Sequence, residues 1–259
     1  MGKRRMIKAD NSLNGISRWL SSDEAKNLIF LENRAAADFF LDVFGYYMVQ
    51  LGDYYPTEIM ASTRVQHKIV VGLSGTICSP SDLACDVEAL PFAEGTVDLM
   101  VLPHVLEFGR DPSMILRETE RVLIGEGYLV VFGFNPWSFF GLTTVFKRWQ
   151  DIAPWNCNFI SAPRLKDWLH VLGFETLIIS RVGYGSLKGE GWSGVTGNGE
   201  KLMKYLFPRL GNSYFLVAKK KIEGLKAVRG KWSKARKILE GGLAKPSVSC
   251  TGGEAWLKR

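Results

Sequence analysis

The chain has 259 residues and a mass of 29.0 kDa, which suits one large domain or one domain with an appendage. Hydrophobic residues make up 46% and charged residues 23%, as in an ordinary globular protein. The mean hydropathy is +0.00, and no stretch approaches the roughly 18 apolar residues that a membrane span requires. The basic start runs into polar residues instead of the apolar core of a signal peptide. We therefore expect a cytoplasmic protein without a transmembrane helix.

The positive charge gathers at the C-terminal end of the sequence. The formal net charge is +7, and residues 219–259 contain 12 Lys and Arg against 3 Asp and Glu. The rest of the chain is therefore close to neutral. We predict a folded domain over residues 1–221 that includes an N-terminal helix, followed by a basic, loosely structured tail over residues 222–259. Such a tail offers a nucleic-acid contact, or it serves only to keep the protein in solution.

The cysteines and histidines do not form a recognisable metal-binding pattern. The four cysteines contain no Cys-x-x-Cys pair, and the three histidines lie far apart in the sequence. We expect neither a bound metal nor a disulfide framework.

The first half of the chain begins with a helix and continues with strands. A helix is predicted over residues 23–43, capped by Ser22 or Asp23, because apolar residues recur there at three- and four-residue steps. These apolar residues are Leu28, Leu31, Ala35, Phe39 and Val43. Strands are predicted over residues 45–52, 67–72, 82–86 and 96–102, from runs of apolar and β-branched side chains.

The second half alternates between helix and strand. A helix is predicted over residues 111–123, with Asp111 as its cap, Pro112 in its first turn, and Met114, Ile115, Val122 and Leu123 facing inward. Further elements are a strand over 127–134, a helix over 162–173 that begins at Ser161 and stops at Gly173, and strands over 174–182 and 213–221. This alternation predicts an α/β fold with a doubly wound, mostly parallel sheet.

One segment carries motifs in a fixed order. Residues 85–131 contain an Asp-x-x-x-Leu-Pro-Phe segment, a Val-Asp strand, a Val-Leu-Glu turn, an Asp-Pro helix start and a Glu-x-x-Arg-Val-Leu helix end before a glycine-rich turn. The residues are Asp86, Leu90, Pro91, Phe92, Val97, Asp98, Val105, Leu106, Glu107, Asp111, Pro112, Glu118, Arg121, Val122, Leu123, Gly125 and Gly127. The segment resembles class I S-adenosylmethionine-dependent methyltransferases, in particular the methyltransferase type 11 group.

The resemblance implies a Rossmann-like, seven-stranded sheet whose last strand, residues 213–221, is antiparallel. It also implies S-adenosylmethionine as the cofactor. Asp86 would meet the adenine amino group, Val87 would offer its backbone amide to the ring, and the backbone would turn beneath the cofactor at Gly52. Leu102 is expected beside the cofactor as well. The alternatives are that Asp86 only forms a turn and that Gly52 only ends a strand. We interpret Asp98 and the Glu118–Arg121 pair as scaffold.

The chain departs from the family pattern at two cofactor contacts. The family follows its first strand with a Gly-x-Gly-x-Gly turn, whereas Gly52 is followed here by Asp53, Tyr54 and Tyr55. The carboxylate expected at the end of the second strand, which binds the ribose hydroxyls, is also absent. Ser74 can supply a neutral hydrogen bond there, and Asp53 can reach across from the first strand.

His104 is the candidate catalytic residue, because it follows the strand that ends near the transferred methyl group. It serves either as a general base or as an orienter of its loop, since a base is needed only when the acceptor must first lose a proton.

Residues 135–137, Asn-Pro-Trp, are similar to an amino-methyltransferase signature but follow the fifth strand instead of the fourth, so a turn is the favoured interpretation. The acceptor pocket is expected to be aromatic, from Trp137, Phe139, Phe140, Trp155 and Trp192, or these side chains only anchor core and loops. Residues 183–199 contain seven glycines and are predicted to form a lid.

The resulting hypothesis is an S-adenosylmethionine-dependent methyltransferase with an unidentified acceptor, and a small molecule is favoured. The alternative is a catalytically inactive, methyltransferase-like binding or scaffold protein that associates with RNA through its basic tail.

Overall fold

The computed structural model describes residues 19, 22–53, 55–56, 58–73, 81–109, 111–138, 141, 158–184, 205–207 and 209–222. Ser74, most of the predicted lid and nearly all of the predicted basic tail lie outside these residues.

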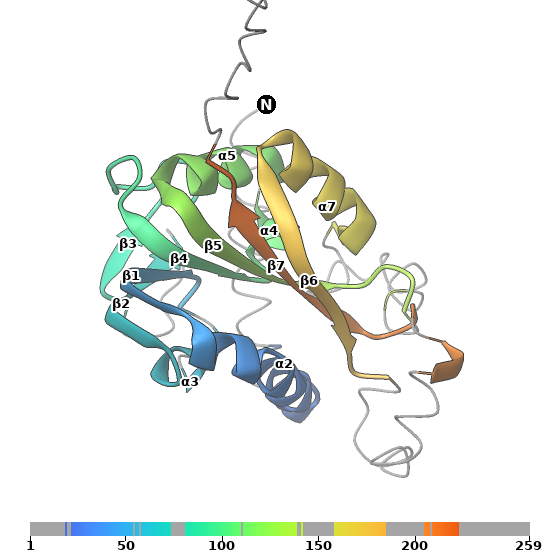
Figure 1. Ribbon diagram of the computed structural model, residues 1–259. Helices are drawn as coiled ribbons and strands as arrows, with labels where there is room; N and C mark the ends of the chain where they lie inside the picture. The colour runs from blue at the N-terminus through green and yellow to red at the C-terminus, as the bar shows by residue number, and fades with distance from the viewer. Residues whose placement is uncertain are drawn as a thin grey trace, which may run out of the picture. The chain divides into compact units, whose positions relative to one another are not determined.

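Seven strands of the described residues form one sheet in the order β3-β2-β1-β4-β5-β7-β6 (Figure 1). They are β1 Phe44–Leu51, β2 Arg64–Leu73, β3 Leu83–Cys85, β4 Val97–Pro103, β5 Leu123–Phe134, β6 Phe174–Val182 and β7 Ser213–Lys220. Strands β1 to β5 pair in parallel, and β7 runs antiparallel between β5 and β6. The predicted mostly parallel sheet and its antiparallel last strand are confirmed.

Among the described residues, three longer helices match the predicted ones, and two short helices were not predicted. The longer ones are α2 Asp23–Asp42, α5 Pro112–Val122 and α7 Ala162–Val171, and the short ones are α3 Glu58–Ala61 and α4 Val105–Phe108. Ser22 Oγ accepts a hydrogen bond from Ala25 N (3.3 Å) and Asp111 Oδ1 from Ser113 N (2.9 Å), as expected for N-caps. Ser161 stands at the N-cap of α7 without a capping hydrogen bond from its side chain.

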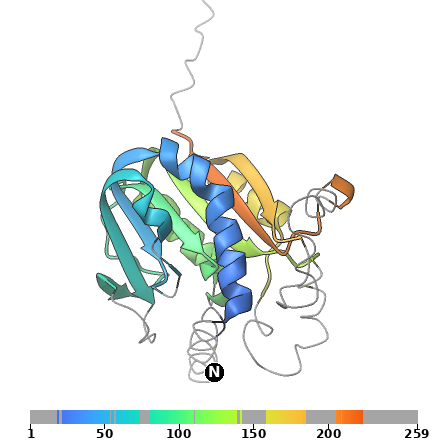
Figure 2. The ribbon, with the colours of Figure 1, turned by 90° about the horizontal axis from the view of Figure 1, so that it is seen from below.

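The helices cover the two faces of the sheet. Helices α5 and α7 lie on one face, and α2 crosses the other (Figures 1 and 2). Because side chains alternate along a strand, neighbouring residues of β1 enter different cores. Val49 packs with Leu102 and Leu116 beneath α5, whereas Met48 packs with Phe40 and Phe132 beneath α2.

The buried stripes of two helices differ from the predicted ones. In α5 the buried residues are Ile115, Leu116, Thr119 and Val122, while Met114 is 40% exposed, so the inward orientation predicted for Met114 is wrong. Met114 lies off the stripe that these residues form. In α2 the predicted Leu31, Ala35 and Phe39 are half-buried, and the fully buried stripe is Ala25, Leu28, Ile29, Glu32, Ala36 and Phe40. This rotation places a carboxylate, Glu32, at the centre of the buried face.

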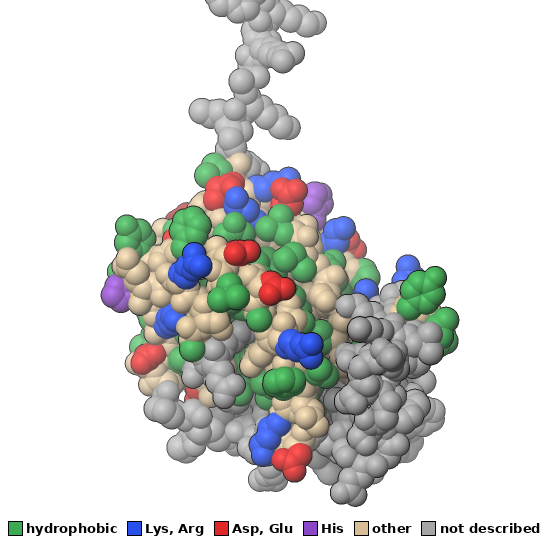
Figure 3. All heavy atoms as spheres, turned by 60° about the horizontal axis from the view of Figure 1, so that its bottom comes forward, with side chains coloured by type: hydrophobic (Ala, Val, Ile, Leu, Met, Phe, Trp, Pro, Cys, Tyr) green, Lys and Arg blue, Asp and Glu red, His purple; other side chains and the backbone are tan. Residues whose placement is uncertain are grey.

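On the surface in Figure 3, hydrophobic side chains lie among Lys, Arg, Asp and Glu side chains in small separate areas. In open α/β sheets, ligands bind beyond the carboxyl ends of the strands.

Candidate active site

The turn after β1 is built around one glycine. Gly52 is buried, has a φ of +99°, and donates its N–H to Val71 O in β2 (2.8 Å). A residue with a side chain adopts this φ only with strain, so glycine is required. The buried Gln50 side chain holds the turn, because its Nε2 donates to Gly52 O (3.2 Å) and Tyr55 O (3.0 Å). The sequence analysis missed this role of Gln50.

Asp53 extends the same turn toward β2. Its side chain is buried, and a Cβ atom added to Gly72 would lie 3.3 Å from Asp53 Oδ2 and 2.7 Å from Ser81 Oγ. The carboxylate of Asp53 therefore stands beside the carboxyl end of β2. That is the place from which the family's missing ribose-binding acid would project.

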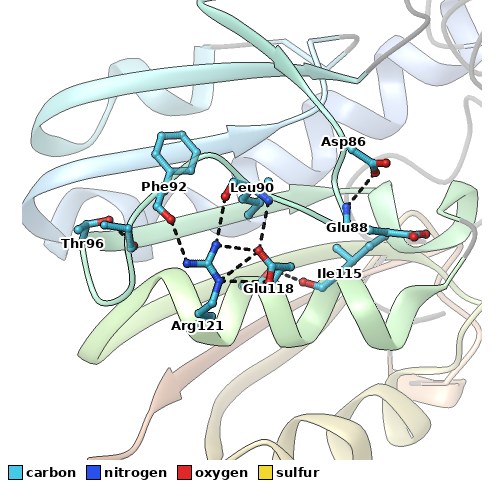
Figure 4. A network of polar contacts seen from close by, with 10 residues as sticks. Asp86, Glu88, Leu90, Phe92, Thr96, Ile115, Glu118 and Arg121 are labelled. Atoms are coloured by element: carbon cyan, nitrogen blue, oxygen red, sulfur yellow. Dashed lines mark hydrogen bonds and ion pairs between the residues drawn. The ribbon is translucent and has the colours of Figure 1, made fainter.

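The loop after β3 carries the predicted adenine contacts. Asp86 is exposed, and its Oδ1 accepts from Glu88 N (3.0 Å), so the residue does form a turn (Figure 4). Its other oxygen, Oδ2, takes no part in that bond. Val87 is half-buried and packs against the apolar core. Leu102 lies near the end of β4 with its side chain fully buried in the same core.

An ion pair on α5 fixes this loop, as Figure 4 shows. Arg121 donates from Nη1 to Phe92 O (3.0 Å), from Nη2 to Leu90 O (3.1 Å), and to Glu118 Oε2 (2.8 Å). Glu118 Oε2 in turn accepts from Leu90 N (3.2 Å). The hydrogen bond from Arg121 lowers the pKa of Glu118 below its ordinary value. The pair is thus scaffold, and it explains why the Leu-Pro-Phe and Glu-x-x-Arg motifs occur together.

Asp98 also has a structural role. Its Oδ2 accepts from the backbone N–H groups of Tyr46 (3.0 Å) and Tyr47 (2.9 Å), which joins the start of β1 to β4. A Cβ atom at Gly45 would lie 2.7 Å from Asp98 Cβ, so this approach requires glycine.

His104 directly follows β4 and has an unusual backbone conformation. Its φ of 55° and ψ of 18° lie in the left-handed region, which residues other than glycine adopt at a cost. Its N–H donates to Phe132 O (2.9 Å), and its ring stacks on Phe134 with centroids 4.2 Å apart. The side chain is 1% exposed.

A buried carboxylate from α2 contacts the His104 ring. The Nε2 atom of His104 lies 3.2 Å from Glu32 Oε1 and 3.3 Å from Oε2. The Tyr55 hydroxyl donates to Glu32 Oε2 (2.9 Å), and the Ser213 hydroxyl donates to Oε1. We call these residues, together with Glu107, the buried cluster. Of these residues, only His104 was predicted from the sequence to be a site residue.

Glu107 lies on the other side of the imidazole ring. His104 Nδ1 is 4.0 Å from Glu107 Oε1, which accepts the N–H of Phe134 (2.8 Å). Within the part of the chain that the structure describes, neither His104 Nδ1 nor Glu107 Oε2 has a hydrogen-bond partner. Buried polar atoms normally find partners, so these two atoms are exceptions that need an explanation.

The surroundings favour the protonated forms of His104, Glu107 and Tyr55. Burial opposes a charged His104, but the charge and hydrogen bond of Glu32, with the charge of Glu107, raise the pKa of His104 overall. Burial raises the pKa of Glu107 despite the opposing effect of His104. Burial, and then Glu32, raise the pKa of Tyr55 well above its ordinary value.

The Asn135 side chain forms a turn, as the favoured interpretation predicted. Its Nδ2 donates to Arg209 O (2.7 Å) and Gly211 O (2.8 Å), and its Oδ1 accepts from Trp137 N (3.2 Å). This turn leaves Trp137 71% exposed. Phe139, Phe140, Trp155 and Trp192 lie outside the described residues.

The described ranges contain neither a candidate membrane-spanning helix nor a candidate metal cluster. No helix there has both the length and the apolar character to cross a membrane. No group of three or more His, Cys, Asp or Glu side chains among those residues is arranged to hold a metal ion.

Comparison with known proteins gives matches in sequence and structure. Residues 46–131 match the model of a methyltransferase domain family. The uncharacterized protein YafS of Escherichia coli is 34% identical over 182 residues, which cover 70% of this chain and 71% of YafS. A solved S-adenosylmethionine-dependent methyltransferase of Thermotoga maritima has a TM-score of 0.57 at 15% identity, covering 83% of this chain and 99% of the other.

A second such enzyme, from Mesorhizobium loti, has a TM-score of 0.51 at 13% identity, covering 77% of this chain and 99% of the other. These two likenesses concern the fold, while the family model and YafS concern the sequence. The matched domain, the strand order and the ordered motifs agree, and the chain belongs to the class I S-adenosylmethionine-dependent methyltransferases.

Proposed function

We propose that the protein transfers the methyl group of S-adenosylmethionine to an acceptor, and that the acceptor is a small molecule. The main support for this proposal is that two features lie together at one edge of the sheet. The Gly52–Asp53 turn follows β1, and the buried His104 follows β4, the neighbouring strand in the sheet. Ligands of open α/β sheets bind at this edge, where the order of the strands reverses.

The residues present fit the cofactor. The buried, positive-φ Gly52 allows the backbone to approach it closely. Asp53 would bind the ribose hydroxyls, since its carboxylate stands beside the end of β2, and Ser74 would add a neutral contact. Asp86 Oδ2 would accept from the adenine amino group, with the Val87 amide facing the ring. When bound, S-adenosylmethionine supplies a methyl group that its sulfonium charge already activates.

The chain itself would then orient the reactants and exclude water. His104 is the residue proposed to touch the acceptor, because it follows β4 and one of its ring nitrogens has no partner among the described residues. Holding two reactants in line supplies much of the acceleration of such a transfer.

Calorimetric titration with S-adenosylmethionine tests the cofactor proposal. We expect binding, and we expect Asp53→Asn and Asp86→Ala each to weaken it about ten- to a hundredfold, since one hydrogen bond to a charged group contributes about 1.5–3 kcal/mol. Asp98→Asn is the matched control, because Asp98 binds only backbone amides of β1 among the contacts described. A folded protein that shows no binding at millimolar cofactor would contradict the proposal.

The second candidate is a methyltransferase-like protein that binds ligands or RNA without catalysis. The single-glycine turn after β1 favours it, because the close backbone approach is available at Gly52 alone. Transfer of labelled methyl from S-adenosylmethionine to a panel of small hydroxyl, amine and thiol compounds and to RNA distinguishes the two. Transfer to any small compound supports the enzyme, whereas labelling of RNA alone contradicts the small-molecule acceptor.

A further inference from the structure

We propose that Glu32 is a positioning residue that makes His104 Nδ1 the proton acceptor for a hydroxyl group, so that the methyl acceptor is an alcohol or phenol. This inference rests on the proposed methyl transfer and deepens it by naming the acceptor class. It depends on how the buried cluster is assembled.

The hydrogen bonds of the imidazole fix its tautomer. The Glu32 oxygens accept hydrogen bonds from the Tyr55 and Ser213 hydroxyls, so the Nε2 atom that faces them at 3.2 Å donates to them and carries the proton. At a pH above the raised pKa of His104 the ring is neutral, and its other nitrogen, Nδ1, then has a free lone pair; Nδ1 is also the ring atom without a partner among the described residues. A neutral imidazole held in this orientation is ready to take a proton.

Glu32 is itself fixed by donors from two other segments. Tyr55, after β1, and Ser213, at the start of β7, each donate a hydroxyl hydrogen bond to one of its oxygens. The carboxylate is fully buried, so it cannot turn toward water. Such locking is what a positioning residue requires, whereas a merely space-filling residue on the apolar face of α2 would be hydrophobic.

Glu107 completes the arrangement on the Nδ1 side. An acceptor hydroxyl at this place can donate its proton to Nδ1, which lies 4.0 Å from Glu107 Oε1. Once His104 is charged, it lies between two carboxylates, and their effect agrees with the raised pKa of His104. The other titratable groups facing the cluster are the hydroxyls of Tyr55 and Tyr214.

The proposed step balances in protons and electrons. The acceptor O–H bond breaks, and its proton goes to His104 Nδ1. The oxygen electron pair forms the new bond to the methyl carbon, while the carbon–sulfur bond breaks with its pair going to sulfur. The sulfonium becomes a neutral thioether, and the imidazolium of His104 later releases its proton to water.

The first test compares the affinities of S-adenosylmethionine and S-adenosylhomocysteine for the full chain by calorimetry across pH. The two differ by one methyl group and the sulfonium charge. If Nδ1 faces the methyl group, protonated His104 repels only S-adenosylmethionine, so the affinity ratio should rise about three- to tenfold as pH rises through the His104 titration. The rise should vanish in His104→Gln and move to lower pH in Glu32→Gln.

Asp38→Asn is the matched control, because Asp38 is an exposed carboxylate on the same helix. It should leave the midpoint of the rise where it is in the unmodified chain. A ratio independent of pH would overturn the inference, as would an unchanged midpoint in Glu32→Gln. The pH dependence of the affinity ratio is measured on the unmodified chain, so this result stands even if a variant fails to fold. If neither compound binds, the proposed function fails as well, so the two failures are distinguishable.

The second test uses catechol as the probe hydroxyl with labelled S-adenosylmethionine. Methylation of catechol should increase with pH, and the acidic limb of the kcat profile should move to lower pH in Glu32→Gln. Absence of transfer to catechol and to every other hydroxyl in the panel would overturn the acceptor class.

Discussion

Two of the polar networks that contain carboxylates, the Glu118–Arg121 network and the buried cluster, differ in sequence separation, exposure and hydrogen bonding. The Glu118–Arg121 network joins α5 to the loop at Leu90–Phe92, a short distance along the sequence, and its two charged side chains are 21% and 35% exposed. The buried cluster draws its residues from positions between 32 and 213, and its central His104–Glu32 contact is at most 1% exposed.

The two networks also differ in how completely they are bonded. The Arg121 guanidinium bonds two carbonyl groups and a carboxylate. The buried cluster leaves His104 Nδ1 and Glu107 Oε2 without partners in the described structure. A fully bonded, partly exposed network serves the scaffold, and an incompletely bonded, buried one costs stability that a functional role would explain.

The largest expected effect is in the buried cluster. Glu32→Ala should lower the free energy of unfolding by about 3–5 kcal/mol, because it leaves a buried histidine and two hydroxyls without their shared partner. Denaturant unfolding measures the change. Glu32→Gln, which keeps shape and an acceptor oxygen, should cost clearly less. Equal losses in the two variants would show that the shape and the remaining acceptor oxygen contribute nothing and that the negative charge carries the whole effect.

Arg121→Ala should have a smaller effect on stability. The variant loses hydrogen bonds to Leu90 and Phe92, and partial exposure of the side chain reduces the loss to about 1–2 kcal/mol. We also expect weaker cofactor binding, because the loop that carries Asp86 loses its anchor. A loss above that of Glu32→Ala would reverse the ranking of the two networks.

The two networks should respond to pH in opposite directions. The folded pKa of His104 is raised above 6.5, so its contribution is fully present below pH 6.5 and is lost as pH rises through the folded pKa. The folded pKa of Glu118 is lowered below 4.5, so its contribution is present above pH 4.5 and is lost as pH falls through the folded pKa. Urea unfolding across pH should show that His104→Gln flattens the alkaline side and Glu118→Gln the acidic side. The opposite assignment would contradict the account.

Asp98→Asn is expected to cost about 0.5–1 kcal/mol, since the amide oxygen can still accept from the N–H groups of Tyr46 and Tyr47, but without charge. Thermal unfolding measures this loss, and calorimetry should show unchanged cofactor affinity. A variant of normal stability with weakened cofactor binding would place Asp98 in the site.

The smallest expected effect concerns the basic tail. A chain that ends at residue 222 should keep its cooperative thermal transition, because the charge of the sequence beyond that point is strongly positive and its apolar content is sparse. A large loss of thermal stability would show that the tail packs into the domain. If the full chain binds RNA through the tail, affinity should fall steeply with added salt.

The sheet could be predicted from the sequence, because its strands are continuous apolar runs separated by clear breaks. Helices α3 and α4 could not, since a single turn is too short to show a helical period. Strand β5 starts at Leu123 because Leu123 pairs with Val97. This long-range pairing leaves no pattern in the local sequence.

The residues of the candidate site likewise divide into those that the local sequence indicates and those that only the folded chain brings together. Gly52, Asp86 and His104 follow predicted strands, so position alone made them candidates. Glu32 escaped notice because a glutamate within an amphipathic helix is ordinarily placed on the solvent side. Its partners Tyr55 and Ser213 are joined to it only by the folded chain, 23 and 181 residues away.

A crystal structure of the full chain with S-adenosylhomocysteine tests the central claim most directly. The account predicts the Asp53 carboxylate within hydrogen-bond distance of the ribose hydroxyls, Asp86 at the adenine amino group, and the sulfur atom directed toward His104 and the buried cluster. A ligand bound with its sulfur away from His104, or with its ribose remote from Asp53, would contradict it.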